Sequence, residues 1–142
     1  SGTDLRQIYG GAKRFNPALM LDCVCNGLNF DLYWVDERGF PYLITVDSKI
    51  VGFALVYKHN ESRYSIVEFF ILKKYRRKDI GASAVLQILD LFQGECEITY
   101  SRENESATRF WPKVAQQYSS GRHDIQHVAY GDWQGWVLRI KT

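Results

Sequence analysis

The sequence has little of what marks several classes of protein. Proline and cysteine occur three times each among 142 residues, and no block of like charge exceeds three residues. With 46% hydrophobic and 15% aromatic residues, the chain is not of the intrinsically disordered, collagen-like or low-complexity kind. A chain of this length closes one hydrophobic core, so we expect a single domain over residues 1–142.

The few cysteines and histidines indicate neither a disulfide framework nor a metal centre. Cysteine is odd in number, and Cys23 and Cys25 have no second Cys or His pair at metal-ligand spacing. His123 and His127 would lie one turn apart on a helix, but the alternating residues around them predict a strand. We therefore expect no metal site.

An excess of one charge and a membrane-length apolar run are also missing. Eighteen Lys and Arg against sixteen Asp and Glu leave a formal charge of +2, too small for whole-surface attraction of nucleic acid or anionic lipid. The longest apolar runs, such as residues 66–72, fall far short of the roughly 18 residues of a membrane helix. The first residues lack the order of a signal peptide. We expect a cytoplasmic protein without a membrane or nucleic-acid partner.

The N-terminal part of the sequence predicts one helix and one long loop. Asn16 and Pro17 precede an apolar stretch that ends at Asn26 and Gly27, which is typical of a short capped helix. Residues 28–41 are aromatic and irregular, and they suit either a loop over a pocket or a loop simply packed down by its aromatics. The first 30 residues show no clear strand.

The rest of the sequence predicts a mixed sheet covered by helices. A run that is apolar on both faces, residues 50–57, is expected inside the sheet. Because a strand–helix–strand crossover joins parallel neighbours, we expect a mixed α+β (α/β) fold. The expected strands are 42–46, 50–57, 64–72, 95–100, 125–130 and 133–140, with one helix that stops before Gly94 and another opened by Asn104.

The segment 68–82 is the richest in chemistry. An apolar strand runs into a turn with Arg76, Arg77 and Lys78, and this turn runs directly into a helix. The first turn of a helix presents unpaired N–H groups and the positive end of the helix dipole. Basic residues that immediately precede it therefore indicate a phosphate site.

This turn resembles the signature of the GNAT superfamily of acyl-CoA-dependent N-acyltransferases, which is Gln or Arg, two residues, Gly, one residue, then Gly or Ala. Arg76 and Gly81 match that spacing, whereas Asp79 stands where the family usually has its first Gly. Asp tolerates a left-handed backbone better than most residues and can cap a helix. Its carboxylate would, however, lie close to a diphosphate.

A later segment is similar to the same family. Residues 104–111 look like its Asn-x-x-Ala-x-x-Phe-Tyr helix, with Trp111 in the last place, and residues 52–56 and 68–70 are further points of similarity. The resemblance covers about residues 33–118 and looks like a small, poorly characterised bacterial branch. It implies a mostly antiparallel, twisted, mixed sheet with a splayed parallel pair of strands, flanked by helices.

The resemblance also implies a co-substrate, an acceptor and a binding mode. The co-substrate is acetyl-CoA or coenzyme A, and the acceptor is a primary amine of a small molecule or peptide. In the family, pantetheine pairs like an extra strand with the strand that ends at Ile71 and Leu72, and the diphosphate meets N–H groups of residues 77–82. The implied cofactor-binding residues are Phe70, Ile71, Leu72, Arg76, Arg77, Lys78, Asp79, Ile80, Gly81, Ala82, Asn104, Ala107, Phe110 and Trp111.

Glu68 and Ile71 are candidates for catalysis. By the resemblance, the Ile71 N–H lies near the thioester oxygen that becomes an oxyanion. Glu68 is the only charged residue of the run 66–72, and burial would raise its pKa toward that of a useful general base. A Glu paired with Arg or with backbone inside the sheet is an equal alternative, and Asp36 and Glu37 are weaker candidates.

Trp111 is the third catalytic candidate, because the family often has a Tyr there that protonates the departing thiolate. An indole N–H donates a hydrogen bond but no proton, so packing under the cofactor is the favoured role of Trp111. Tyr75, Tyr118 or solvent are alternative proton donors.

Three functions therefore stay open. The favoured one is an enzyme that transfers the acyl group directly, without a covalent enzyme intermediate. The second is a module that binds acyl-CoA but has lost turnover, as Asp79 and Trp111 suggest. The third is a single-strand nucleic-acid platform, which the near-zero net charge disfavours. The C-terminal hairpin, with Trp133 and Trp136, either contacts a second subunit in a homodimer or completes the core.

Overall fold

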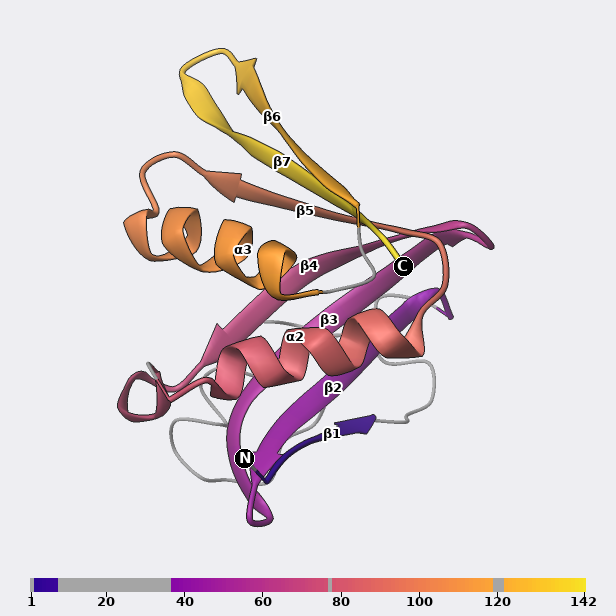
Figure 1. Cartoon of the computed structure of the whole chain (residues 1–142), viewed down its shortest axis with the longest axis vertical. Coiled ribbons are helices and arrows are strands. Elements are labelled where there is room, and N and C mark those ends of the chain that lie inside the picture. The colour runs from indigo at the N-terminus through magenta and orange to yellow at the C-terminus, as the bar shows by residue number, and fades with distance from the viewer. Residues whose placement is uncertain (1, 8–36, 77, 119–121) are drawn as a thin grey trace.

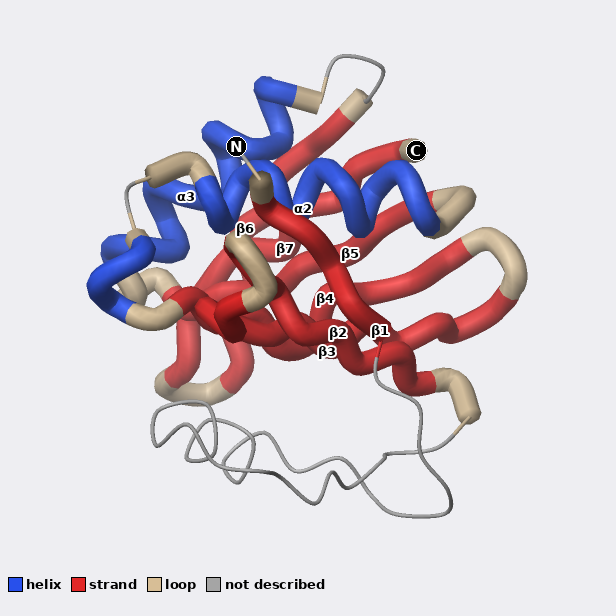
Figure 2. The backbone as a smooth tube through the Cα atoms, turned by 90° about the horizontal axis from the view of Figure 1, so that it is seen from below, coloured by secondary structure: helices blue, strands red, loops and turns tan. Residues whose placement is uncertain are grey.

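The fold is a seven-stranded sheet with two α-helices packed on one side of it (Figures 1 and 2). The computed structural model describes residues 2–7, 37–76, 78–118 and 122–142. Its elements are β1 (Thr3–Gln7), β2 (Gly39–Val46), β3 (Lys49–Asn60), β4 (Arg63–Ile71), the 3-10 helix η1 (Lys73–Tyr75), α2 (Ile80–Leu91), β5 (Glu95–Ser101), α3 (Glu105–Gln117), β6 (His123–Tyr130) and β7 (Trp133–Lys141).

The strand order is β1-β2-β3-β4-β5-β7-β6. Every neighbouring pair is antiparallel except β4 and β5, which the crossover through α2 makes parallel. The predicted mixed α+β fold, mostly antiparallel with one parallel pair, is confirmed. No helix of the described residues is long and apolar enough to cross a membrane.

The core lies between the sheet and the two helices. One face of α2 buries Ile80, Ala84, Val85, Ile88 and Leu89, at the three- and four-residue spacing that the sequence shows. Residues 51–56 of β3 are all buried, as expected for an interior strand. On the C-terminal hairpin Trp136 packs against the core, whereas Trp133 is exposed at 37%.

Two expectations about the strands need correction. β2 begins at Gly39, so Phe40 and Pro41 belong to a strand and not to the aromatic loop; the Phe40 ring packs on Phe92 at 5.5 Å between centroids. An N-terminal strand, β1, pairs with β2 although its polar sequence gives little strand signal. The helix predicted around residues 16–27 and most of the aromatic loop lie outside the described residues.

The parallel pair β4 and β5 has a closed end and an open end. Its register contains only three residue pairs, from Arg63 with Glu95 to Ser65 with Glu97. Beyond them a β-bulge leaves Val67 without a partner on β3, because Leu55 faces Glu68 while Val56 faces Ile66. Figure 1 shows the two strands running apart toward their C-terminal ends, with α3 between them. The predicted splayed pair is therefore present.

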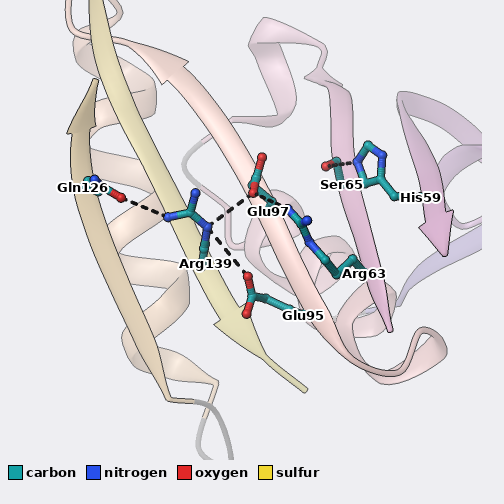
Figure 3. A network of polar contacts seen from close by, with 7 residues as sticks. All are labelled: His59, Arg63, Ser65, Glu95, Glu97, Gln126 and Arg139. Carbon is teal, nitrogen blue, oxygen red and sulfur yellow. Dashed lines mark hydrogen bonds and ion pairs between the residues drawn. The ribbon is translucent and has the colours of Figure 1, made fainter. Parts of the chain in front are cut away.

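Ion pairs tie the closed end together on the face away from the helices (Figure 3). The Glu97 carboxylate lies 3.1 Å from Arg63 Nη2 and 3.3 Å from Arg139 Nε. Arg139 Nε also lies 3.6 Å from Glu95 Oε1. These ion pairs therefore lie at the end of the pair where β4 and β5 are in register.

Candidate active site

The open end of β4 presents backbone groups that β5 does not pair. The Leu72 N–H donates to the Val51 oxygen of β3 at 2.8 Å. Backbone groups of successive residues alternate sides along a strand, so the N–H and C=O of Phe69 and of Ile71 point away from β3. Because β5 pairs with β4 only as far as Ser65, these groups face the gap between the strands. We call them the open edge of β4.

On the helix face, this gap is lined by an aromatic cluster of Phe69, Phe110 and Trp111. The Phe69 ring centroid lies 5.7 Å from that of Phe110 and 5.4 Å from that of Trp111. Trp111 is only 6% exposed and contacts Phe110 at 4.9 Å between centroids. The structure thus places Phe110 and Trp111 of α3 beside β4, with Trp111 packed in the core.

Asp79 has the left-handed backbone that its place in the motif requires. Its φ is 60° and its ψ is 7°, directly before the first residue of α2. The expectation that its side chain caps α2 is wrong, because the Asp79 carboxylate accepts no hydrogen bond from an N–H group of the helix. An N-cap side chain normally reaches back from an extended backbone, and Asp79 is not extended. The N–H groups of Ile80, Gly81 and Ala82 precede the first helical hydrogen bond, which runs from Ser83 to the Asp79 oxygen.

Gly81 lies where α2 touches α3 and β4. A Cβ there would be 3.1 Å from Phe110 Cε1 and 3.6 Å from Ile71 Cγ1. A side chain at position 81 would therefore crowd Phe110. This packing reason for glycine adds to the predicted one, the close approach of a diphosphate. Ala82 and Asp79 also line an open groove of about 470 Å³ along the outer face of α2, and this groove does not extend to Glu68 or Ile71.

Arg76 turns back toward β4. Its Nε donates a 2.7 Å hydrogen bond to the Ile71 oxygen, and its guanidinium carbon lies 5.3 Å from the centre of the Phe70 ring. Lys78 is exposed just before α2, and Arg77 lies outside the described residues. The basic turn and the open edge are thus joined by one side chain, a contact that spacing alone did not predict.

Glu68 lies on the opposite face of β4 from the helices. Phe69 and Ile71 face α2 and α3, so the alternation of the strand places Glu68 and Phe70 on the other face. The prediction that Glu68 is buried is wrong: it is exposed, because it follows the bulge, where the pairing with β5 has ended. Partial desolvation still raises its pKa above the ordinary value.

The alternative role of Glu68, a carboxylate paired with Arg or with backbone, finds no partner among the described residues. Among these residues, no ion pair or hydrogen bond joins its carboxylate to Arg or to backbone. Of the weaker candidates, Glu37 is exposed, and Asp36 lies outside the described residues. Glu68 is therefore the acidic group that the described structure places beside the open end of β4.

Asn104 and Ala107 share one contact at the start of α3. The Asn104 side-chain oxygen accepts the Ala107 N–H at 3.0 Å, which caps the helix as expected for Asn at this position.

Of the alternative proton donors, Tyr75 lies in η1 at the open end, whereas Tyr118 follows the last residue of α3. Because Tyr118 follows Trp111 by seven residues, it lies about 10 Å further along the axis of α3.

No group of three or more His, Cys, Asp or Glu within the described part of the chain could hold a metal ion. His123 and His127 lie on β6, the predicted strand. Cys96 is buried and free, and burial raises its pKa to about 12. A buried thiol of this kind is inert as a nucleophile.

Two features of the site were missing from the sequence-based prediction, the Val67 bulge and the contact between Arg76 and the Ile71 oxygen. The sequence carries no distinct signal for the bulge, because consecutive apolar residues occur both at Ile66 and Val67 and again over residues 69–72. No signal in the sequence indicates the second contact.

Comparison with solved structures finds similar folds. A GNAT family acetyltransferase from Elizabethkingia anophelis with acetyl-CoA bound has a TM-score of 0.60 and 12% identity, over 99% of this chain and 97% of that one. Ard1 from Thermoplasma volcanium has a TM-score of 0.60 and 17% identity, over 100% of this chain and 99% of that one. A chimera of spermidine N-acetyltransferase SpeG from Vibrio cholerae and hSSAT has a TM-score of 0.65 and 12% identity, over 99% of this chain and 95% of that one.

Identities this low show the fold and no more. A search of curated protein sequences finds no significant match. A family model, however, matches residues 5–115, which is more than half of the chain and includes both segments with the predicted motifs. The chain therefore belongs to the acetyltransferase (GNAT) family.

Proposed function

We propose that the protein is an N-acyltransferase that moves an acetyl or other short acyl group from coenzyme A to a primary amine. The observation that carries the proposal is the open edge of β4, which lies beside the turn that leads into α2. A strand edge suits the amide groups of pantetheine, and a helix N-terminus with basic residues suits a diphosphate. Membership of an acetyltransferase family supports the same donor.

The donor lies along the open edge in this proposal. Its pantetheine arm pairs with the open edge of β4, the backbone groups of Phe69 and Ile71, beside the aromatic cluster of Phe69, Phe110 and Trp111. Its diphosphate meets the N–H groups at the start of α2, flanked by basic side chains. The proposed donor-binding residues are those predicted from the sequence: Phe70, Ile71, Leu72, Arg76, Arg77, Lys78, Asp79, Ile80, Gly81, Ala82, Asn104, Ala107, Phe110 and Trp111.

The acceptor amine approaches from the face of β4 that carries Glu68. An alkyl ammonium with a pKa near ~10.4 is neutral only about once in two thousand at pH 7, so the amine needs a base before it attacks. The Glu68 carboxylate takes this proton, directly or through water, and its raised pKa makes it a stronger base than an ordinary carboxylate. Glu68 is therefore the proposed general base.

The transfer then proceeds without a covalent enzyme intermediate. The amine nitrogen attacks the thioester carbonyl carbon, and the Ile71 N–H donates to the oxygen that becomes negative. The carbon–sulfur bond breaks, and the thiolate, with a pKa of roughly 8.5, is a tolerable leaving group. Tyr75 or solvent supplies its proton. The products are an amide and free coenzyme A.

A binding module that has lost turnover is the second candidate. Asp79 places a carboxylate before the helix N-terminus, and Trp111 has no proton to give and is packed in the core. A nucleic-acid platform has less support, because Arg76 is bound to the Ile71 oxygen. The acceptor class, a small molecule or a peptide, is part of the proposal, and the similar spermidine N-acetyltransferase chimera is consistent with the former.

Three measurements test the proposal: thermal unfolding, thiol release and titration calorimetry. Acetyl-CoA is expected to raise the melting temperature of the protein, and a panel of primary amines is expected to include at least one that releases thiol from acetyl-CoA above background. Stabilisation by acetyl-CoA without thiol release from any amine would favour the binding module. No heat on titration with millimolar acetyl-CoA and coenzyme A would contradict both.

A further inference from the structure

The contact between Arg76 and Ile71 occupies the mouth of the proposed donor site. Arg76 follows η1, and its Nε reaches back five residues to the Ile71 oxygen at 2.7 Å while the guanidinium lies against the Phe70 ring. The backbone that carries Arg76 is fixed, since its N–H donates to the Lys73 oxygen at 3.2 Å. No described residue pairs with the two Nη groups of Arg76.

The Ile71 oxygen is the last acceptor on the open edge of β4. Leu72 faces β3 through its N–H, and Lys73 already belongs to η1. An amide-bearing ligand that pairs with β4 from the open side therefore needs the Ile71 oxygen for the final hydrogen bond of the ladder. In the structure, this acceptor is held by Arg76.

We propose that Arg76 is a latch that makes the donor site selective for thioesters with a diphosphate. The inference rests on the proposed function and goes beyond it by naming the residue that sets donor specificity. When a diphosphate arrives at the start of α2, the guanidinium exchanges the Ile71 oxygen for phosphate oxygens. The Ile71 oxygen then becomes available to an amide N–H of the pantetheine arm.

The exchange is favourable because of the charges involved. A guanidinium bound to a neutral carbonyl through one N–H gains less than a guanidinium bound to an anionic phosphate through a two-pronged contact. A donor with the same arm but no phosphate offers no such compensation and has to break the hydrogen bond unaided. The latch thus weakens the binding of phosphate-free donors and not that of coenzyme A.

Removal of the side chain changes the affinity for two ligands in opposite directions. The full chain and the variant Arg76→Ala are titrated with coenzyme A and with pantetheine, which carries the same arm without phosphates. The variant is expected to bind coenzyme A about tenfold more weakly and pantetheine about tenfold more tightly, the size of effect of one charge-assisted hydrogen bond. A loss of general stability would weaken both.

Two further variants separate charge from contact. Lys74→Ala also removes one positive charge, two residues before Arg76. The Lys74 ammonium lies 5.2 Å from the centre of the Tyr75 ring, and its loss is expected to leave the affinity for pantetheine unchanged. Arg76→Lys keeps the charge but loses the Nε donor, so it is expected to bind pantetheine more tightly while it retains most of the affinity for coenzyme A. Melting temperatures establish that each variant is folded.

The Arg76 Nε–H resonance in the labelled protein gives a readout without a mutation. Saturating coenzyme A is expected to move it from its hydrogen-bonded position. If Arg76→Ala weakens coenzyme A and pantetheine alike, the latch is wrong and the proposed function stands. If the wild type binds neither ligand, the proposed function is contradicted and the latch with it.

Discussion

The two ends of the β4–β5 pair are built in different ways. At the closed end, the strands are in register, and the Glu95 N–H donates to the Ser62 oxygen at 2.8 Å where the chain enters β5. Ion pairs from Glu97 to Arg63 and Arg139 cross the strands there. At the open end, the same two strands share no register pair, and one side chain, that of Arg76, holds an edge oxygen. Pairing between β4 and β5 is thus confined to one end, and at the other end β4 has backbone groups that β5 does not pair.

In this sheet, the edge of β4 that β5 leaves open lies next to a short stretch where the same two strands are in register. The Val67 bulge turns β4 away from β5 at the point where register ends. We therefore expect substitutions at the closed end to change stability and substitutions at the open end to change ligand binding and turnover.

Gly94→Ala at the closed end is expected to cause the greatest loss of stability. Gly94 has a φ of +115°, and a Cβ there would overlap the Ser62 carbonyl oxygen, which is backbone and cannot move aside cheaply. The expected loss is about 3 kcal/mol of unfolding free energy in urea denaturation.

Gly131→Ala is the matched control for Gly94→Ala. Gly131 also has a positive φ of +58°, but a Cβ there meets nothing within 4 Å. Only the left-handed backbone is penalised, at about 1 kcal/mol. Equal losses in the two variants would mean that the close approach at Gly94 does not anchor the closed end.

Next in size is the effect of Glu68→Gln on turnover. If Glu68 is the general base, the variant loses about a hundredfold in kcat, while its affinity for coenzyme A is unchanged. Glu97→Gln, on the same face at the closed end, serves as the control and is expected to keep its kcat. Unchanged turnover and pH profile in Glu68→Gln would remove Glu68 from the mechanism.

A smaller effect is expected at Asp79. Both Asp79→Asn and Asp79→Gly remove a charge near the proposed diphosphate and are expected to strengthen coenzyme A binding by about 1 kcal/mol. Only Asp79→Gly also relieves the left-handed backbone, at φ 60°, and it is expected to add about 0.5 kcal/mol of stability. Titration calorimetry and thermal unfolding separate the two effects; weaker binding by both variants would show that the carboxylate helps the donor.

Loss of the ion pairs at the closed end is expected to have a modest effect. Glu97→Gln removes a carboxylate that pairs with both Arg63 and Arg139, whose side chains are 52% and 31% exposed, while Arg139 keeps Glu95. Partly exposed pairs contribute ~1 kcal/mol or less, and salt screens them. The difference in unfolding free energy from wild type should shrink in high salt, and a difference that salt does not alter would argue against an ionic origin.

The smallest effect is the pH dependence of stability at Glu68. Its pKa is raised in the folded protein by partial desolvation, so the folded state favours the protonated carboxyl. The resulting stabilisation is present below the ordinary pKa of Glu and is lost as the pH rises through the folded pKa. Glu68→Gln is therefore expected to melt slightly higher than wild type at neutral pH, with the difference vanishing in acid.

The sequence predicted most of the fold because local signals and tertiary structure agree there. The buried stripe of α2, the Asn104 cap and the apolar run of β3 each follow from residue spacing or type. β1 was missed because an edge strand with alternating polar residues resembles a loop in composition. β2 was predicted too short because Pro41 and Gly39 read as loop residues.

The candidate site was predictable in its residues but not in its geometry. The turn from Arg76 to Gly81 and the helix after Asn104 were found by spacing. The exposure of Glu68 depends on where β5 stops pairing, and the Arg76 hydrogen bond depends on the path of η1. Both are set by contacts between segments, which no local pattern in the sequence encodes.

Hydrogen exchange of the β4 amides shows whether the open edge of β4 receives the donor. With coenzyme A bound, the amides of Phe69 and Ile71 are expected to exchange more slowly, because the pantetheine arm pairs with them. Those of Tyr64 and Ser65, at the closed end, are expected to keep their rates. Unchanged exchange at Phe69 and Ile71 while calorimetry shows coenzyme A bound would contradict the account.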